Sequence, residues 1–246
     1  MRKNKHANTI INLNVKFQEH KMNTKKFDQE KFNDFVLNNK IISFNEKPFR
    51  LTSGGISNMY INWRLNDTFL MDQLKDYIIL FTESLELNPD CFYGVPDGAT
   101  KLGIITQLEW ARKSPNYGPG SHCLPMGRKT PKKNGNPKDK CYVGKPKGKT
   151  ILLEDNITTA SSLISSMDDV EKLKESNIIA VIALTNRIAS KKGRNYFEKQ
   201  LEKRNVSHYS LSDAITLIPR AYKATNPSHE IRESLIKEYS DFALKI

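Results

Sequence analysis

The segment from Ile151 to Ser162 constrains the fold of this chain more than any other part of the sequence. It reads ILLEDNITTASS, so an apolar run leads into two adjacent carboxylates, Glu154 and Asp155, and then into a cluster of small hydroxyl residues. This order is typical of a buried parallel strand followed by a tight turn into a helix. Because the N–H groups at a helix N-terminus point outward and the helix dipole is positive there, the turn is a candidate phosphate site.

The same residues also have a simpler interpretation. Ser and Thr before a helix are ordinary N-caps, and an Asp at a strand end is common in α/β proteins. Spacing alone does not choose between capping and phosphate binding. The segment is not a P-loop, because it lacks a Gly-Lys-Ser/Thr triplet, and it is not a dinucleotide-binding fingerprint, because no G-x-G-x-x-G follows the strand.

The length and the cysteine content bound the class of protein. A chain of 246 residues is long enough to bury the core of one α/β domain with extensions. No apolar run approaches the roughly 18 residues that span a membrane, so no membrane association is expected. Three cysteines without C-x-x-C spacing disfavour a disulfide scaffold or a zinc site and predict a cytoplasmic location.

The net charge of +12 is concentrated in one segment. Between Arg128 and Lys149 the chain has nine Lys or Arg residues and a single acid, Asp139. The segment has few aromatic residues and no long helical face, the features that nucleic-acid binders tend to use. We therefore expect a polyphosphate partner and no nucleic acid, with a solvated Lys-rich loop as the alternative.

The hydrophobic pattern along the chain predicts an α/β fold with a mainly parallel sheet flanked by helices. Residues 1–24 are polar and predict a loosely ordered tail. Helices are expected over about 27–36, 68–87, 99–111, 161–175, 196–204 and 228–244. Strands are expected at 49–51, 59–63, 91–95, 122–126, 150–153, 178–184 and 206–211. In such folds ligands bind outside the carboxyl ends of the strands.

The acidic pair followed by a hydroxyl-rich loop resembles the signature of the type I phosphoribosyltransferases. The resemblance implies that the acids contact the ribose hydroxyls of phosphoribosyl pyrophosphate and that the loop binds its 5′-phosphate. The residues implied in this site are Glu154, Asp155, Asn156, Ile157, Thr158, Thr159, Ala160, Ser161 and Ser162. Ala160 or Ser161 stands where the family usually has Gly, and a side chain there narrows the allowed backbone angles.

Further segments, from about Phe35 to Leu217, resemble the orotate phosphoribosyltransferases within that family. Residues 49–64, FRLTSGGISNMYINWR, resemble the hood that lies over the orotate ring. The resemblance implies that Tyr60, Ile61 and Thr158 contact the base. Thr52 stands where the family has a lysine that contacts both ligands.

Two further segments, each at the end of a predicted strand, also resemble the orotate phosphoribosyltransferases. Residues 94–101, GVPDGATK, resemble the pyrophosphate loop and imply that Asp97 and Gly98 contact phosphoribosyl pyrophosphate. The strand ending in IALTNR places Arg187 where the family has an arginine that pairs with the orotate carboxylate. A planar guanidinium suits this task, because it binds a carboxylate through two parallel hydrogen bonds.

Residues 128–135, RKTPKKNG, resemble the mobile catalytic loop Arg-Lys-x-x-Lys-x-His-Gly. The resemblance implies catalytic roles for Arg128, Lys129, Lys132 and Asp155. It also implies that Asn134, in place of the usual His, contacts phosphoribosyl pyrophosphate. In the family this loop, here 128–139, closes over the site of the neighbouring subunit, which implies a homodimer.

The resemblance as a whole predicts a type I phosphoribosyltransferase fold with a small hood at about 25–65, a core at about 66–220 and a C-terminal helix. The predicted reaction joins phosphoribosyl pyrophosphate to N1 of orotate, a step of pyrimidine and UMP biosynthesis. Mg²⁺ is expected as the cofactor, held mainly by the substrate, with Asp155 as the protein candidate. Two alternatives remain: a related phosphoribosyltransferase with another base, and a non-catalytic regulator that binds phosphoribosyl pyrophosphate and nucleic acid.

Overall fold

The structure, a computed structural model, describes residues 26–51, 54–136 and 140–246. The predicted tail at 1–24 lies outside the described residues, as do Thr52 and the last positions of the predicted catalytic loop, 137–139. None of the helices in the described part of the chain combines the length and apolar character that crossing a membrane requires.

The described helices are α1 (Gln29–Asn38), α2 (Thr68–Ser84), α3 (Thr100–Arg112), α4 (Ser161–Glu171), α5 (Lys191–Glu202), α6 (Ala214–Thr225) and α7 (His229–Glu238). The described strands are β1 (Ile42–Arg50), β2 (Ile56–Ile61), β3 (Cys91–Gly94), β4 (Gly148–Ile157), β5 (Ser176–Asn186) and β6 (Ser207–Asp213). The predicted alternation of strands and helices is confirmed from β3 onward, with most boundaries shifted by a few residues.

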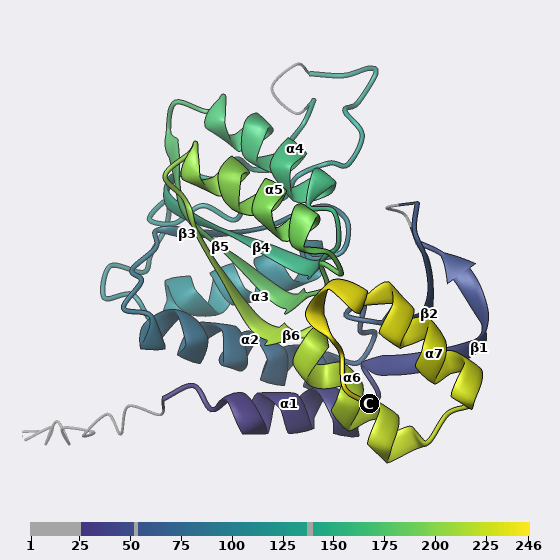
Figure 1. Cartoon of the computed structure of the whole chain (residues 1–246). Helices are drawn as coiled ribbons and strands as arrows, with labels where there is room; N and C mark the ends of the chain where they lie inside the picture. The colour runs from purple at the N-terminus through teal and green to yellow at the C-terminus, as the bar shows by residue number, and fades with distance from the viewer. Residues whose placement is uncertain (1–25, 52–53, 137–139) are drawn as a thin grey trace, which may run out of the picture.

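The strands form two sheets. β3, β4, β5 and β6 pair in that order and are parallel throughout, whereas β1 and β2 form a separate antiparallel hairpin. In Figure 1, α4 and α5 cover one face of the parallel sheet, and α2 and α3 cover the other. The hairpin, α6 and α7 lie beyond the carboxyl ends of the strands. The predicted α/β architecture with a parallel sheet and a small hood is therefore confirmed.

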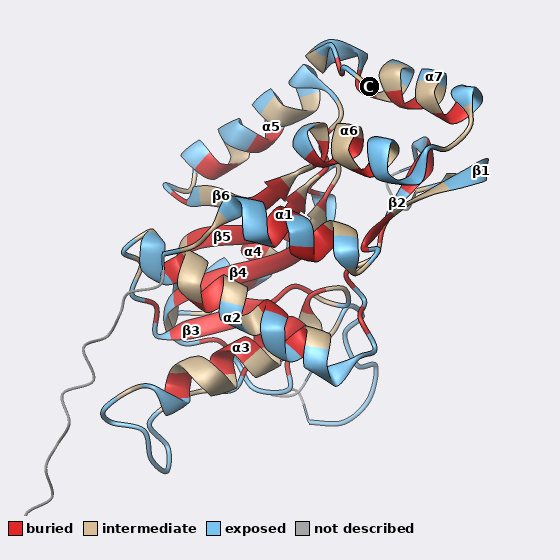
Figure 2. Cartoon of the chain, turned by 90° about the horizontal axis from the view of Figure 1, so that it is seen from below, coloured by how far each residue is buried: buried red, intermediate tan, exposed pale blue. Residues whose placement is uncertain are grey.

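The central strands are apolar along their length because both of their faces are covered. Ile151 and Leu153 of β4 belong to the core on the side of α2 and α3, whereas Leu152 packs toward α4 and α5. The buried colour of the parallel strands in Figure 2 follows this arrangement. Strands with alternating apolar and polar residues would suit a sheet with one face exposed to solvent. The continuous apolar runs instead favour a sheet covered by helices on both faces.

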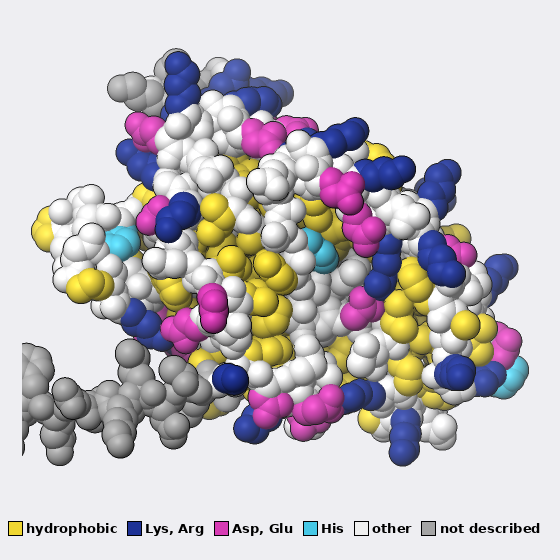
Figure 3. All heavy atoms as spheres, turned by 60° about the vertical axis from the view of Figure 1, so that its left-hand side comes forward, with side chains coloured by type: hydrophobic (Ala, Val, Ile, Leu, Met, Phe, Trp, Pro, Cys, Tyr) yellow, Lys and Arg dark blue, Asp and Glu magenta, His cyan; other side chains and the backbone are white. Residues whose placement is uncertain are grey.

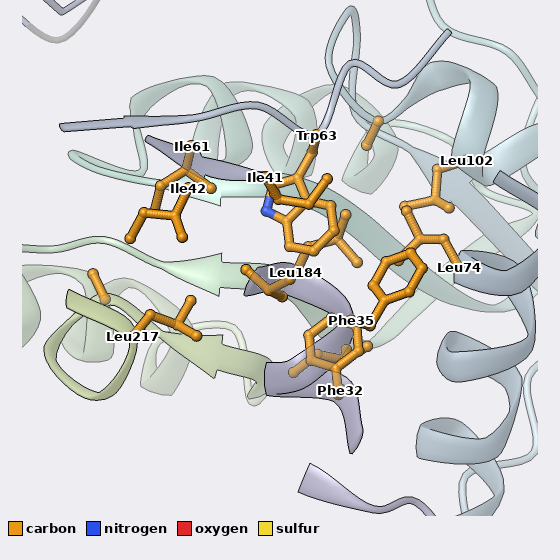
Figure 4. Close-up of a cluster of buried hydrophobic side chains, with 14 of the residues drawn as sticks. Phe32, Phe35, Ile41, Ile42, Ile61, Trp63, Leu74, Leu102, Leu184 and Leu217 are labelled. Carbon is orange, nitrogen blue, oxygen red and sulfur yellow. The ribbon is translucent and has the colours of Figure 1, made fainter. Parts of the chain in front are cut away.

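The hood is joined to the core through aromatic packing (Figure 4). The rings of Phe32 in α1 and Trp63 just after β2 stack with centroids 5.9 Å apart. The Trp63 indole N–H donates to the Thr185 hydroxyl of β5 at 2.9 Å. Both residues of this hydrogen bond are buried, so the bond fixes the position of the hood over the end of β5.

The prediction of a strand at 122–126 is wrong. The segment has no strand assignment, and its continuation makes only an isolated bridge between Gly127 and Tyr142. Pro125 lacks an N–H group and so weakens any ladder there. The Cys123 carbonyl instead accepts from the Gln107 side chain at 2.9 Å, which satisfies it without a neighbouring strand.

The C-terminal region also differs from the prediction. Helix α6, which contains Pro219, is not among the predicted helices. Asp213 caps this helix by accepting from the Ile215 N–H at 2.9 Å. The single helix expected over 228–244 ends at Glu238 and is followed by a short 3-10 turn, Ser240–Phe242. Helix α7 packs on β1 and β2, so the end of the chain completes the hood.

Candidate active site

The acidic pair lies near the carboxyl end of β4, at the edge where ligands bind in folds of this kind. Glu154 is only 5% exposed, and Asp155 is half-buried. One Glu154 oxygen, Oε1, accepts from the Asp155 N–H at 3.2 Å, whereas Oε2 is buried with no hydrogen-bond partner among the described residues. Asp155 Oδ1 accepts from the Asn156 N–H at 2.7 Å. A buried carboxylate oxygen without a partner is uncommon in a folded protein, and functional sites are one place where it occurs.

Burial raises the pKa of Glu154 well above its usual value, and the neighbouring Asp155 carboxylate raises it further. The two side chains therefore share less negative charge in the free protein than two exposed carboxylates carry. A cation or ligand hydroxyls arriving at this edge would lower the pKa of Glu154 again, because they stabilise its charged form.

The loop after β3 packs directly against Asp155. A side chain added to Gly98 would place its Cβ 2.3 Å from Asp155 Oδ2, closer than real atoms approach. The loop and the end of β4 therefore form one surface, which brings Gly98 and Asp155 together as the sequence predicts. Asp97 precedes this contact, and its side chain is 65% exposed.

The hydroxyl-rich bend places a left-handed residue at the start of α4. Ala160 stands at the N-cap of α4 with φ 61° and ψ 8°, in the left-handed region. No side chain caps this helix. The plain capping interpretation of the sequence is therefore not supported, and the first N–H groups of α4 are available to an anion. Thr159 is exposed, and its hydroxyl hydrogen-bonds that of Ser161 at 3.0 Å.

The hood meets the site through backbone atoms. The Asn156 amide donates to the Ile61 carbonyl at 3.2 Å, while Asn156 Oδ1 is buried with no partner among the described residues. The Ile61 side chain is buried in the core, and the Tyr60 side chain is 40% exposed. Of the two predicted base contacts in the hood, Tyr60 is the one that presents its side chain to solvent.

Arg187 lies beneath the hood and is 5% exposed. Its guanidinium donates to the Ser57 hydroxyl at 2.8 Å and to the Met59 carbonyl at 2.6 Å. Glu238 of α7 lies 3.8 Å from the same nitrogen, and Nε is buried with no partner among the described residues. Burial raises the pKa of Glu238, and the Ser57 hydroxyl and Arg187 oppose that rise. Nothing local in the sequence signals Glu238, because it is far from Arg187 along the chain.

The described part of the predicted catalytic loop 128–139 is a hairpin-like excursion, which we call the flap. Its stem is closed by the Arg128 N–H, which donates to the Cys141 carbonyl at 2.9 Å, and by the Lys132 N–H, which donates to the Lys140 carbonyl at 2.9 Å. Lys129 Nζ lies 3.6 Å from Asp97 Oδ2, so this cation borders the candidate site within one chain. The Lys132 and Asn134 side chains are exposed. Sharing of the flap between two chains stays a prediction.

The side chains at this edge could hold a metal ion only together with oxygen atoms of a bound substrate or of water. The described residues contain no group of three His, Cys, Asp or Glu side chains placed to hold a metal ion. Glu154 and Asp155 offer carboxylate oxygens at one edge, including the unpartnered Oε2. Mg²⁺ prefers oxygen ligands and keeps most of them from water or phosphates, so the pair fits as a partial site.

Two cavities lie away from the acidic edge. One of about 420 Å³ is lined by residues from the end of α3 and the segment after it, including Cys123. The other, of about 390 Å³, lies at the start of α2 and α3 and includes Lys101. Neither is lined by Glu154 or Asp155, and what marks the acidic edge is its set of unpartnered polar atoms.

Solved structures share this architecture. An orotate phosphoribosyltransferase from Francisella tularensis superposes with a TM-score of 0.58 at 18% identity, over 85% of this chain and 98% of that chain. An orotate phosphoribosyltransferase from Aeropyrum pernix gives 0.56 at 18% identity, over 77% and 97%. The chain has the type I phosphoribosyltransferase fold.

A third structure, the UMP synthase of Leishmania donovani, gives a TM-score of 0.63 at 13% identity. The match covers 86% of this chain and 42% of that longer chain. No protein-family model and no curated protein matches the sequence. The structural likeness therefore establishes the phosphoribosyltransferase fold, and the identity of the base is a separate question.

Proposed function

We propose that this chain transfers the phosphoribosyl group of phosphoribosyl pyrophosphate to N1 of orotate, giving orotidine 5′-phosphate and pyrophosphate. The observation that carries the proposal is the buried, unpartnered Oε2 of Glu154 beside Asp155, next to the uncapped N-terminus of α4. A pentose phosphate supplies hydroxyl donors for the first and an anion for the second. A role for the bend in capping alone accounts for neither.

In this proposal each part of the site holds one part of the donor substrate. Glu154 and Asp155 bind the ribose hydroxyls, and the bend from Thr158 to Ser162 binds the 5′-phosphate through the N–H groups of α4. The pyrophosphate lies against the loop at Asp97 and Gly98, which packs directly on Asp155. Positioning and electrostatics supply most of the catalysis, and no protein nucleophile is needed.

The bond between C1′ and the pyrophosphate oxygen breaks as orotate N1 bonds to C1′, and pyrophosphate leaves with the electron pair. The proton of orotate N1 passes to a pyrophosphate oxygen or to water. Lys129, together with Arg128 and Lys132 of the flap, stabilises the negative charge that develops on the leaving group. When bound, Mg²⁺ supplies further charge neutralisation on the substrate oxygens. Closing the flap excludes water from the ribosyl centre.

A second candidate is a phosphoribosyltransferase for a base without a carboxylate. The contact between Arg187 and Glu238 favours it, because an acid from the chain itself already faces the guanidinium that would receive the orotate carboxylate. For orotate to bind Arg187 in two parallel hydrogen bonds, Ser57, Met59 or Glu238 must give up its contact. The two candidates differ only in the base, so a panel of bases separates them.

The test is a product assay with phosphoribosyl pyrophosphate, Mg²⁺ and orotate, uracil or a purine in turn, analysed by chromatography. The expected result is orotidine 5′-phosphate, formed at a rate that falls by a factor of about 10²–10³ in Asp155→Asn. Asp169→Asn is the matched control, since its exposed carboxylate pairs with Lys172 at the end of α4. A product from another base selects the second candidate, and a folded protein that turns over none of the bases contradicts both.

A further inference from the structure

Two cysteines meet at the amino end of the edge strand. Cys91 is the first residue of β3 and is fully buried, while Cys123 lies in the following segment and is partly exposed. The Cys91 and Cys123 side chains are close neighbours, and the backbone of Lys147 lies beside both. The pair therefore lies at the opposite end of the strands from Glu154 and Asp155 and plays no part in the proposed reaction.

One side chain holds the two segments together. Gln107 of α3 is buried, and its Oε1 accepts from the Phe92 N–H at 2.8 Å. Its Nε2 donates to the Cys123 carbonyl at 2.9 Å. The same amide thus binds the residue next to Cys91 and the backbone of Cys123. This bridge holds the backbone of Cys123 beside the strand that begins at Cys91.

Cys123 is reachable from solvent. It lines the cavity of about 420 Å³ at the end of α3, together with Tyr117, His122 and Leu124. Figure 3 shows the side of the molecule that forms the left edge of Figure 1, where hydrophobic side chains gather in a hollow. The Cys91 hydrogen bond and the Lys147 backbone lower the pKa of Cys123 to about 7, so a large share of its thiol is ionised near neutral pH.

The segment that begins at Cys123 leads into the flap. A side chain on Gly127 would collide with the Tyr93 hydroxyl and with Pro96, so Gly127 packs against the carboxyl end of β3. The Met126 carbonyl accepts from the Val143 N–H at 2.7 Å at the base of the flap stem. Residues 123–127 therefore connect the thiol pair at one end of β3 with the flap stem at the other.

We propose that Cys91 and Cys123 form a reversible disulfide site, oxidised by small-molecule disulfides, that tethers the base of the flap to β3. The Cys123 thiolate attacks one sulfur of the small disulfide and releases one small thiol. The Cys91 thiol then loses its proton and displaces the second small thiol from Cys123. The protein pair is oxidised by two electrons, and one small disulfide is reduced to two thiols.

The test treats the reduced full-length protein with oxidised glutathione at about pH 8, where the Cys123 thiol is largely ionised. Free thiols are then blocked, the protein is digested without a reducing agent, and the peptides are mapped by mass spectrometry. The expected product is a Cys91–Cys123 disulfide in the unaltered chain and in Cys141→Ser. Cys141 is the matched control, because it is also partly exposed and lies in the flap stem.

Single variants separate the two steps of the reaction. Cys123→Ser is expected to form no internal disulfide, and Cys91→Ala to retain glutathione on Cys123. Below pH 7 the reaction rate of Cys123 is expected to fall about tenfold for each pH unit. An unreactive Cys123, glutathione retained on Cys123 of the unaltered chain, or a disulfide that includes Cys141 overturns the proposal. If Cys91→Ala does not fold, the comparison of three proteins decides: the unaltered chain, the Cys123→Ser variant and the Cys141→Ser variant.

The tether has its own readout, which needs no catalytic turnover. Amide hydrogen exchange at Arg128 and Lys132 in the stem is expected to slow several-fold on oxidation and to recover with dithiothreitol. Unchanged exchange in a protein that carries the disulfide contradicts the link to the flap. Because neither measurement uses a substrate, both remain decisive even where the proposed transferase activity is absent.

Discussion

Lys129 Nζ lies 3.6 Å from Asp97 Oδ2, which joins the flap to the pyrophosphate-loop segment of the same chain. Both side chains are about two-thirds exposed, so the pair contributes little to stability. Its significance is positional: a cation of the flap already borders the acidic edge without a second subunit. The resemblance implies instead that the flap acts across a dimer, and the two arrangements predict different results.

Mixing two inactive variants distinguishes them. Lys129→Met and Asp155→Asn are each expected to lower turnover by a factor of about 10²–10³. If the flap acts on the partner, co-refolded chains recover about a quarter of full activity, because half of the random dimers each contain one intact site. If the flap acts within its own chain, no activity returns. Co-purification through an affinity tag on one variant measures whether mixed dimers form, and so separates a flap acting in its own chain from failed mixing.

Gly98→Ala is expected to disturb Asp155, because the added Cβ would lie 2.3 Å from its carboxylate. We expect a stability loss of about 1–3 kcal/mol from overpacking and a weakening of phosphoribosyl pyrophosphate binding by at least about tenfold. Calorimetry and thermal melting measure the two effects. Gly118→Ala is the control, since a Cβ there meets nothing within 4 Å. Equal behaviour of the two variants would show that the loop does not pack on Asp155.

Glu238→Gln is expected to change which bases bind. Removing its charge leaves the buried guanidinium of Arg187 without its acidic neighbour, so affinity for orotate rises about tenfold while affinity for uracil is unchanged. Isothermal titration in the presence of phosphoribosyl pyrophosphate measures both affinities. Glu233→Gln, an exposed position on the same helix, is the control. A parallel change for orotate and uracil would mean that Glu238 acts on the shape of the hood and not on charge.

His208 makes stability depend on pH. Burial and, to a smaller extent, the charge of Arg194 lower its pKa to about 4. A group with a depressed pKa takes up a proton more readily in the unfolded chain, so its contribution is lost as pH falls from about 6.5 to about 4. The shift corresponds to about 3 kcal/mol. His208→Gln is expected to flatten that part of the urea-unfolding profile, whereas His229→Gln, which is exposed, leaves it unchanged.

Glu154 and Glu238 oppose this trend, because burial raises the pKa of each. Their protonated forms are favoured in the folded chain, so their contributions are greatest at low pH and are lost as pH rises. The informative quantity is therefore the difference between the variant and the unaltered chain. A His208→Gln profile that stays parallel to that of the unaltered chain between pH 4 and 6.5 would contradict the assignment.

The sequence predicts the parts of the fold that local patterns control. The continuous apolar runs of β4 and β5 signal strands that are buried on both faces, and the acids at 154 and 155 signal the ligand edge. The turn between β4 and α4 is also predicted, although the left-handed conformation of Ala160 is not. Each of these signals lies within a dozen residues, which is the range over which periodicity is informative.

Features that depend on distant contacts were missed. The segment 122–126 has the composition of a strand, but Gln107 of α3 satisfies its backbone, and Pro125 weakens pairing. Helix α6 contains Pro219, which local rules treat as a break, yet burial of Leu217 and Ile218 holds it together. Glu238 reaches Arg187 only because α7 folds back onto the hood. No local pattern encodes such a return of the chain.

The anchoring of the hood determines how molecules reach the site. Trp63 is bonded to Thr185, the Ile61 carbonyl to Asn156, and the Met59 carbonyl to Arg187, so the hairpin is tied to the strand ends along its length. A hairpin held in this way does not move as a hinged lid. We expect substrates to enter and products to leave past Gly98 and the flap. The opening rate of the flap would then set the upper limit on turnover.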